Sequence, residues 1–287
     1  MAYDRIEVRP IAGALGAEIA GVDLSRPLGN ETFAEVHRAF LEHLVIFFRD
    51  QTLDPQQHKA FARRFGALQI DPIVKAIPGH PEILEVAKET DERLNFGGAW
   101  HSDMTFLERP PLGSVLYALE VPEYGGDTLF ASMYLAYESL SAGMRAMLDG
   151  LIAIHTGERC YGPKSVSERF TEDRRMQVDS GPEAMAVALK EIEHPVVRTH
   201  PETGRRALYV NGSYTQRFKD MTEAESRPML DFLYGHAVRL EFTCRFRWRR
   251  GSMALWDNRA AMHNAVNDYH GQRRIMHRAT IDGDRPR

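Results

Sequence analysis

The sequence predicts a mainly β protein with helical inserts, built as a sandwich or a barrel. Its 287 residues are 43% hydrophobic and 26% charged, a composition typical of a globular protein with a sizeable core. After residue 111, seven short apolar or alternating runs recur with turn residues between them, and helical patterns interrupt the series at two places. This arrangement favours a sandwich or a barrel over a doubly wound parallel sheet. The seven predicted strands are LGSVLYALEV, DTLFAS, HPVVRTH, RALYVNG, EFTCRFRW, SMALWDN and RRIMHRATI.

The first fifty residues predict two strands, a helix and a third strand. Short strands are expected around Ile6–Val8 and Ala17–Val22. Apolar side chains at near-helical spacing predict a helix from Glu31 to Leu44. The run LVIFFRD, which follows directly, predicts a buried strand over residues 44–50.

A second helix is predicted over residues 54–65 from its end signals. Asp54 followed by Pro55 makes a good N-cap and first-turn pair, and Gly66 is placed to end the helix. The first of the two helical inserts is expected at about 133–150.

The second helical insert is expected near residues 222–237, and its start is open between two positions. Thr222 and Glu225 form a capping-box pattern. With Thr222 as the cap, Pro228 lies in the helix interior, where it is costly; with Ser226 as the cap, it lies in the tolerated first turn.

Charge, cysteine content and hydropathy exclude several classes of protein. Thirty-six Lys and Arg against forty Asp and Glu give a net charge of −4, so nucleic acid is not an expected partner. Cys160 and Cys244 lie far apart in the sequence, which fits a reducing cytosol and no disulfide framework. The opening MAYDRIEVRPIAG lacks the features of a signal peptide, and no run approaches eighteen apolar residues. A soluble cytoplasmic protein with no membrane partner is expected.

No internal repeat, low-complexity tract or Pro/Gly/Ser linker divides the chain. We therefore expect residues 1–287 to form a single domain.

A candidate metal site occurs in the stretch GGAWHSDMTF. His101 and Asp103 stand two residues apart in a region that reads as extended, and on a strand this spacing puts both side chains on one face. An imidazole and a carboxylate there can hold one edge of a divalent metal ion. Taken alone, the pair also fits an ordinary hydrogen-bonded pair at the surface.

The C-terminal stretch adds a third candidate ligand and two arginines. His263 is followed eleven residues later by Arg274 and fifteen residues later by Arg278, so a strand, a turn and a second strand can return an arginine beside the histidine. The even separation of the two arginines places them on one face of a strand, where each can hold an anionic group. Arg273 points the other way and fits a solvated position.

These motifs resemble one family, the taurine dioxygenase and 2,4-dichlorophenoxyacetate dioxygenase family of iron(II)- and 2-oxoglutarate-dependent oxygenases. The resemblance spans nearly the whole chain and keeps the order of the motifs. It implies a double-stranded β-helix, the jelly roll of cupin-like proteins, which agrees with the strand count. The motifs are LGAEIAGVDLSRPL, RRFG, WHSDMTF, EVPEYGGDTLFAS, HPVVRTHPETGRRALYVN and the segment from WDN to HRATIDGD.

The resemblance implies a role for five residues at the cofactor site. His101, Asp103 and His263 match the family's facial triad of iron ligands. Thr128 and Arg274 match the residues that bind the distal carboxylate of 2-oxoglutarate. Dioxygen is the third reactant that the resemblance implies, and a homo-oligomer is the expected assembly.

The substrate site departs from that of taurine dioxygenase. Arg278 matches the arginine that holds the anionic group of the substrate. Asp71 and Val74 stand where taurine dioxygenase has a His and a Tyr near the sulfonate, so these two contacts are lost. Gly97 replaces a substrate-contacting Asn, although Asn95 lies close enough in sequence to take its place. Taurine is therefore not the expected substrate.

Other stretches look closer to the aryloxyalkanoate (phenoxypropionate) dioxygenases of the same family. The expected substrate is then an aryloxyalkanoate carboxylate, held by Arg278 and cleaved to a phenol and a keto acid. Alkyl sulfonates and alkyl sulfates are the alternative, because Arg278 accepts any small oxyanion. The apolar wall expected for the ring can equally be ordinary core; its residues are Ile73, Val74, Ile77 and Phe106.

Two other classes of function remain alternatives to the oxygenase, and one segment is a candidate lid. The same three ligands fit a zinc hydrolase, against which Thr128 and Arg274 argue, or a jelly roll that binds metal and ligand without turnover. The polar segment 158–185 is predicted to be a lid over the substrate or a flexible surface loop.

Overall fold

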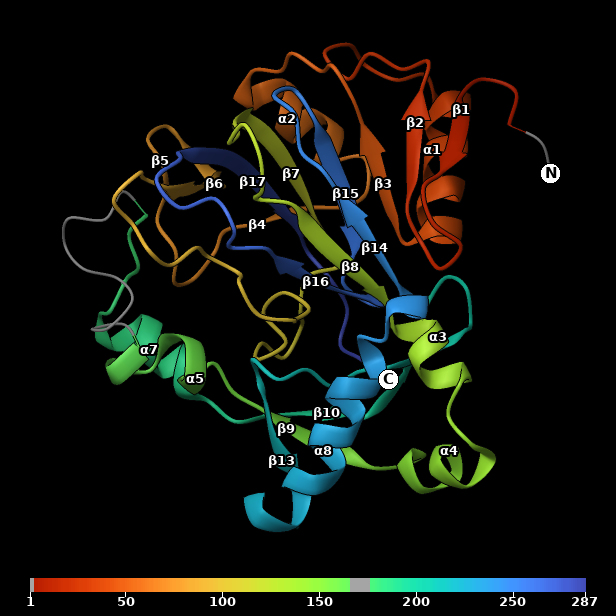
Figure 1. The fold of residues 1–287 in the computed structure, drawn as a ribbon, viewed down its shortest axis with the longest axis vertical. Helices are drawn as coiled ribbons and strands as arrows, with labels where there is room; N and C mark the ends of the chain where they lie inside the picture. Colours follow the sequence, from red (N-terminus) through yellow and green to blue (C-terminus); the bar gives the residue numbers. More distant parts are fainter. Residues whose placement is uncertain (1–2, 166–175) are drawn as a thin grey trace.

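Two β-sheets that pack against each other form the centre of the protein (Figure 1). The computed structural model describes residues 3–165 and 176–287. Within these ranges the main sheet has nine strands. Eight of them follow the order β1 (Glu7–Pro10), β2 (Ala17–Ala20), β3 (Val45–Phe48), β15 (Met253–Asp257), β7 (Gly113–Glu120), β17 (Arg274–Ile281), β6 (His80–Lys88) and β5 (Ala76–Ile77). The ninth, β4 (Leu68–Gln69), pairs with β17 outside this order.

The second sheet is antiparallel and lies over the inner face of the main sheet. Its order is β14 (Thr243–Phe246), β8 (Thr128–Ser132) and β16 (Ala261–Ala265). Aromatic side chains join the two sheets: Phe47 of β3 stacks on Phe246 of β14, with ring centroids 3.8 Å apart, and contacts Phe130 of β8 edge-on. This pair of sheets, with helices inserted between strands, confirms the predicted mainly β jelly roll.

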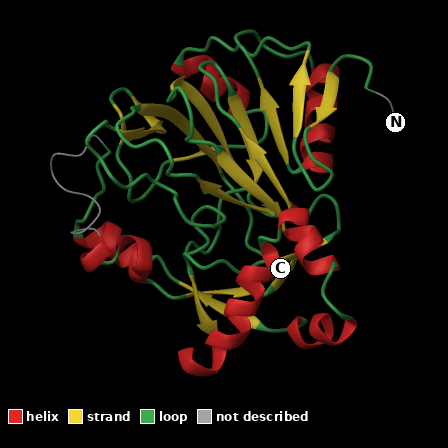
Figure 2. Cartoon of the chain, in the orientation of Figure 1, coloured by secondary structure: helices red, strands yellow, loops and turns green. Residues whose placement is uncertain are grey.

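Helices cover the outer face of the main sheet and the far end of the molecule (Figure 2). Helix α1 (Asn30–His43) packs on β2, β3 and β15, and α2 (Pro55–Ala62) packs on β6, β7 and β17. A second apolar core fills the space between these helices and the sheet. The remaining helices are α3 (Met133–Glu138), α4 (Ala142–Leu148), α5 (Glu158–Tyr161), α7 (Pro182–Leu189), α8 (Glu223–Ala237) and the 3-10 helix η1 (Leu240–Phe242).

Two small sheets extend the molecule beside α8. One has the order β10 (Ile192–Pro195), β9 (Ile152–His155) and β13 (Thr215–Phe218), and the other pairs β11 (Val197–Thr199) with β12 (Arg206–Leu208). None of the helices in the described part of the chain has the length and apolar character needed to cross a membrane.

Side chains along β17 alternate between the two faces of the sheet, as the sequence predicts. Arg274 and Arg278 are both buried on its inner face, four residues apart. Arg273, just before the strand, points away and forms ion pairs with Glu89 and Glu120. The register in which β17 pairs with β7 and β6 fixes where each arginine lies along the strand direction of the sheet.

Three secondary-structure predictions need correction or completion. The insert at 133–150 is two helices, because Ser141 caps a new helix, α4. Helix α8 starts after Thr222, which forms a capping box with Glu225, and Pro228 lies inside the helix. The sequence prediction missed β6, in which Pro81 and the acidic residues Glu82 and Glu85 hide a strand that is buried toward its end.

Part of the predicted lid segment 158–185 lies outside the described residues, namely 166–175. On either side of that gap the segment contains α5 and the start of α7. Val178 also pairs with Val74 through an isolated bridge. A lid role for this segment stays a prediction, as does the expectation of one domain over residues 1–287.

Two buried histidines predict how the stability of the fold depends on pH. Burial lowers the pKa of His58, which contacts the Val115 carbonyl, to about 4, and it lowers the pKa of His194 to about 4. Between pH 6.5 and pH 4 the unfolded chain therefore binds protons that the folded chain does not bind. We expect the free energy of unfolding to fall across this window, by up to about 1.4 kcal/mol per pH unit for each histidine.

Urea unfolding of the metal-free protein at several pH values measures this dependence. A matched His58→Gln variant keeps a donor for the Val115 carbonyl but cannot be protonated, so its slope should be shallower. A free energy of unfolding that is flat between pH 6.5 and pH 4 would contradict the prediction.

Candidate metal centre and its two cavities

Two backbone hydrogen bonds hold His101 beside His263. His263 lies on β16, and its amide donates to the His101 carbonyl at 2.8 Å, while the His101 amide donates to the His263 carbonyl at 3.1 Å. Directly opposite residues of an antiparallel pair project to one face. The two imidazole rings accordingly lie 4.2 Å apart between centroids.

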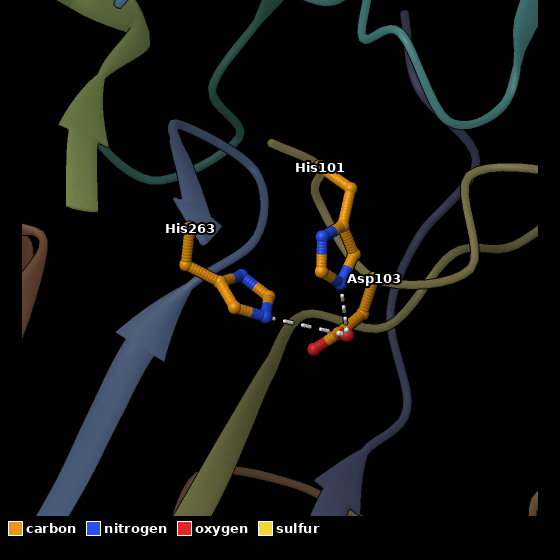
Figure 3. Close-up of side chains that lie close together, drawn as sticks. All are labelled: His101, Asp103 and His263. Atoms are coloured by element: carbon orange, nitrogen blue, oxygen red, sulfur yellow. Dashed lines mark ion pairs between the residues drawn. The ribbon is translucent and has the colours of Figure 1, made fainter. Parts of the chain in front are cut away.

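Asp103 completes a cluster of three potential metal ligands (Figure 3). Its Oδ1 lies 3.6 Å from Nε2 of His101 and 3.8 Å from Nε2 of His263. One ligand atom from each residue lies within 4.8 Å of the others, and all three side chains are buried. Two imidazole nitrogens and one carboxylate oxygen on one side of a site are the ligands that non-haem ferrous iron takes, with the other positions left open.

The chain reaches this geometry by a turn and not by the extended strand that the sequence predicts. His101 forms only an isolated bridge with His263, and the chain turns at Asp103. Met104 adopts a left-handed conformation with φ of 46°. The turn, together with the bridge, brings the two side chains together.

The two histidines have different surroundings. Nδ1 of His101 contacts the Ala99 carbonyl at 2.7 Å, which assigns the proton to Nδ1 and leaves Nε2 free to face Asp103. Burial lowers the pKa of His263 to about 3, so its imidazole is uncharged at neutral pH. Neutral imidazole is the form that binds a metal ion.

Two polar side chains hold the carboxylate of Asp103 in place. Ser114 Oγ donates to Asp103 Oδ2 at 2.9 Å. The Asn258 amide oxygen accepts from the Asp103 backbone amide at 3.1 Å and from Trp256 Nε1 at 3.0 Å. Burial opposes ionisation of Asp103, but the charge of Arg278 outweighs it with help from the histidines, and the pKa lies well below the usual range. Sequence analysis missed Ser114 and Asn258, because only strand pairing brings them to the site.

A cavity of about 450 Å³ opens on the side of the centre formed by His101 and Asp103. Arg278 and Arg159 lie on its wall. The rest of the wall combines polar side chains, such as Asn95 and Asn267, with the apolar and aromatic residues Phe96, Met104, Tyr161 and Tyr214. Tyr214 lies edge-on to the His101 ring at 6.2 Å. The sequence analysis found none of these four wall residues.

A second cavity, of about 30 Å³, lies on the other side and links the histidines to Arg274 and Thr128. Arg274 is 4% exposed, and its Nε and Nη2 atoms have no hydrogen-bond partner among the described residues. Trp248 donates from Nε1 to Thr128 Oγ1 at 2.9 Å and also faces the Arg274 guanidinium. A buried cation without a counter-charge is costly, so this cavity suits an anionic group at its Arg274 end.

Arg278 lines both cavities and is held between two carboxylates. Its Nη1 donates to Asp103 Oδ1 at 3.2 Å, and its Nη2 lies 3.5 Å from Asp71 Oδ2. Burial raises the pKa of Asp71, while Arg278 and two backbone amides favour its ionised form.

The remaining predicted substrate residues occupy different places. Asn95 lines the larger cavity, but its amide group donates to the Ala265 carbonyl at 2.8 Å. Val74 is not among the described residues that line either cavity; it packs against Leu84 and Met176. Gly97 has φ of 74°, and a Cβ there would lie 3.4 Å from the His101 ring, so the position favours glycine.

Comparison with known proteins gives a family match over most of the chain. The family model described as taurine catabolism dioxygenase TauD, TfdA family matches residues 7–280. A taurine dioxygenase from Burkholderia xenovorans has a crystal structure that superposes with a TM-score of 0.81 at 38% identity, covering 99% of this chain and 93% of that chain.

Two curated relatives act on sulfate esters by name. The alpha-ketoglutarate-dependent sulfate ester dioxygenase of Pseudomonas putida is 38% identical over 98% of this chain and 91% of its own length. The alkylsulfatase of Acinetobacter baylyi is 37% identical over 98% of this chain and 86% of its own length. The (S)-phenoxypropionate/alpha-ketoglutarate-dioxygenase of Sphingobium herbicidovorans is less similar, with 30% identity over 97% of this chain and 95% of its own length.

The hydrogen bond from Ser114 to Asp103 predicts a measurable loss of metal affinity. Ser114→Ala removes a donor that orients the ligand carboxylate, and such changes cost about 10- to 100-fold in metal affinity. Anaerobic titration of the apoprotein with Fe(II) measures the dissociation constant.

Ser102→Ala is the matched control, because the Ser102 hydroxyl is also buried but donates to the Ala261 carbonyl at 2.8 Å. Equal affinities for Fe(II) in the wild type and Ser114→Ala would show that the bond does not orient the ligand. Asp103→Ala should abolish iron binding altogether.

Proposed function

We propose that this chain, which belongs to the taurine catabolism dioxygenase TauD, TfdA family, oxidises alkyl sulfate esters. Members of this family are dioxygenases that depend on Fe(II) and on alpha-ketoglutarate, also called 2-oxoglutarate, and this chain is one of them. The jelly roll and the cluster of His101, Asp103 and His263 agree with that class.

The observation that carries the proposal is a buried guanidinium in the cavity that opens on the metal centre. Arg278 is 5% exposed and lies on the wall of the larger cavity together with His101 and Asp103. A planar guanidinium can donate charge-assisted hydrogen bonds to two oxygens of a sulfate group. The apolar and aromatic part of the wall suits an alkyl chain.

The relatives favour the sulfate ester over the aryloxyalkanoate that the sequence motifs suggest. Two sulfate ester enzymes are 38% and 37% identical to this chain, whereas the phenoxypropionate dioxygenase is 30% identical. Both kinds of substrate carry one anionic group near the carbon that is oxidised, so the motifs around Arg278 do not separate them. The sequence gives alkyl sulfates as the alternative substrate, and the relatives support this alternative better than the aryloxyalkanoate.

We assign the roles of the other residues by the chemistry of their surroundings. His101, Asp103 and His263 hold Fe(II), which with bound 2-oxoglutarate and dioxygen supplies the oxidising power. Arg274 and Thr128 bind the distal carboxylate of 2-oxoglutarate, since Arg274 is buried on the smaller cavity and its Nε and Nη2 donate to none of the described residues.

Arg278 holds the sulfate group so that the carbon next to the ester oxygen faces the metal. The apolar wall keeps water away from the reacting carbon.

The proposed reaction balances without a further reductant. One atom of dioxygen enters succinate as 2-oxoglutarate loses carbon dioxide, and the other enters the C–H bond of the carbon that bears the sulfate. The hydroxylated ester then loses the hydroxyl proton as its C–O bond to sulfate breaks. An alkyl sulfate therefore yields an aldehyde, inorganic sulfate, a proton, succinate and carbon dioxide.

The substrate proposal is tested with a panel of acids on the Fe(II)-loaded enzyme. Hexyl sulfate should give equal amounts of aldehyde, inorganic sulfate and succinate, with dioxygen required. A 2-phenoxypropionate and taurine should each give much less succinate at the same concentration. Faster turnover of the phenoxypropionate than of any alkyl sulfate would overturn the proposal in favour of the aryloxyalkanoate substrate.

Single substitutions of the two arginines should separate the two anion sites. Arg278→Ala removes charge-assisted bonds worth about 1.5–3 kcal/mol, so KM for the alkyl sulfate should rise by roughly 10- to 100-fold. Arg274→Ala should raise KM for 2-oxoglutarate by a similar factor and affect the ester little. Equal effects of each change on both ligands would contradict this division of roles.

A homo-oligomeric assembly and a cytoplasmic location stay predictions.

A further inference from the structure

We infer that Asp71 makes the anion site at Arg278 selective for singly charged over doubly charged oxyanions. The inference rests on the proposed function, because the ester to be bound carries one negative charge and the inorganic sulfate to be released carries two. Asp71 would then favour substrate binding and product release together. It is a specificity-determining residue that acts through Arg278.

The Asp71 carboxylate is fixed by donors on both of its oxygens. Oδ1 accepts the backbone amides of Ile73 and Val74 at 2.9 and 2.8 Å, and Oδ2 lies 3.5 Å from Arg278 Nη2. The side chain is 4% exposed. Because the partners of both oxygens are donors or a cation, the site holds Asp71 as a charged carboxylate.

Asp71 lies behind Arg278 as seen from the cavities. Among the described residues that line them, Arg278 is present in both and Asp71 in neither. A ligand in the cavity therefore contacts the guanidinium, while Asp71 acts on the ligand only through its charge.

Asp71 is also the counter-charge that Arg278 keeps when the metal centre is filled. The other carboxylate on Arg278 is Asp103, and it uses Oδ1, the same oxygen that faces Nε2 of both histidines. A metal ion held by Asp103 and the two histidines would compensate much of the charge of that carboxylate. Arg278 and Asp71 then form a buried pair with no net charge.

Such a pair treats ligands of different charge unequally. The repulsion between Asp71 and a ligand at a fixed place grows in proportion to the charge of the ligand. The repulsion is therefore about twice as large for inorganic sulfate, which has two charges, as for an alkyl sulfate, which has one. In a buried site this difference is little screened by salt.

The test measures equilibrium binding with three probes of nearly the same size and shape. Dimethyl sulfone is neutral, methanesulfonate carries one charge, and inorganic sulfate carries two. Each is titrated, without dioxygen, into the holoenzyme with Fe(II) and 2-oxoglutarate, and the shift of the visible band of the iron chelate reports binding. No turnover is needed, so the result is independent of whether alkyl sulfates are the substrate.

Asp71→Asn is the informative variant. Its amide oxygen can still accept the amides of Ile73 and Val74, so the local turn is kept while the charge is removed. We expect unchanged binding of dimethyl sulfone, tighter binding of methanesulfonate, and a gain for sulfate that is about the square of the gain for methanesulfonate. A threefold gain for the monoanion thus predicts roughly ninefold for sulfate.

Asp23→Asn is the matched control, since Asp23 Oδ1 accepts the Ser25 amide at 2.9 Å in a similar turn at an exposed position. This variant should bind all three probes like the wild type. Equal changes for the three probes in Asp71→Asn, or no change, would overturn the inference.

A measurement on the wild type covers the case in which Asp71→Asn does not fold. Methanesulfonate should bind the wild-type holoenzyme more tightly than inorganic sulfate does, although it carries half the charge. The reverse order is what Arg278 alone would produce, and it would also overturn the inference.

Discussion

The two backbone hydrogen bonds between His101 and His263 are the constraint on which the rest of the site depends. They tie the segment before the Asp103 turn to β16, an edge strand of the second sheet, and so they fix two ligand side chains on one face. Asp103 lies in the turn that follows His101, where its amide donates to Asn258. Two cavities border this centre, and His101 and Arg278 line both of them.

The charges around this centre are arranged for ligands and not for the stability of the empty protein. Arg274 is buried and forms no ion pair with a carboxylate of the described residues, while Arg278 is buried between two carboxylates. Burying a charge is costly unless a partner compensates it. The anionic end of a ligand at Arg274 is such a partner, so part of the free energy of binding there is the relief of this cost. At Arg278 the two carboxylates already compensate the charge. Strand β17 carries both arginines.

Features that depend on the alternation of side chains along one strand, or on the order of motifs in the chain, could be predicted from the sequence. Alternation along one strand placed Arg274 and Arg278 on the same face, and the order of the motifs indicated the family and its jelly roll. The sequence was insufficient where distant segments meet. Ser114 reaches Asp103 only through the register of β7, and the ion pair of Asp71 with Arg278 joins residues more than two hundred positions apart. No periodicity or motif carries such contacts, since each depends on how the sheets pack.

The spacing of the two arginines also bears on which bond can react. Four residues along a strand correspond to about 13 Å between the Cα atoms of Arg274 and Arg278, and the metal centre borders the cavities between them. The two arginines that we propose as anchors for the cosubstrate and the substrate are therefore carried by one strand. Since Arg278 also touches the ligand Asp103, an anion held there lies close to the metal. The carbon presented for oxidation must then be within a bond or two of the anionic group. An alkyl sulfate meets this condition at the carbon that bears its ester oxygen, which is the carbon that the proposed reaction oxidises.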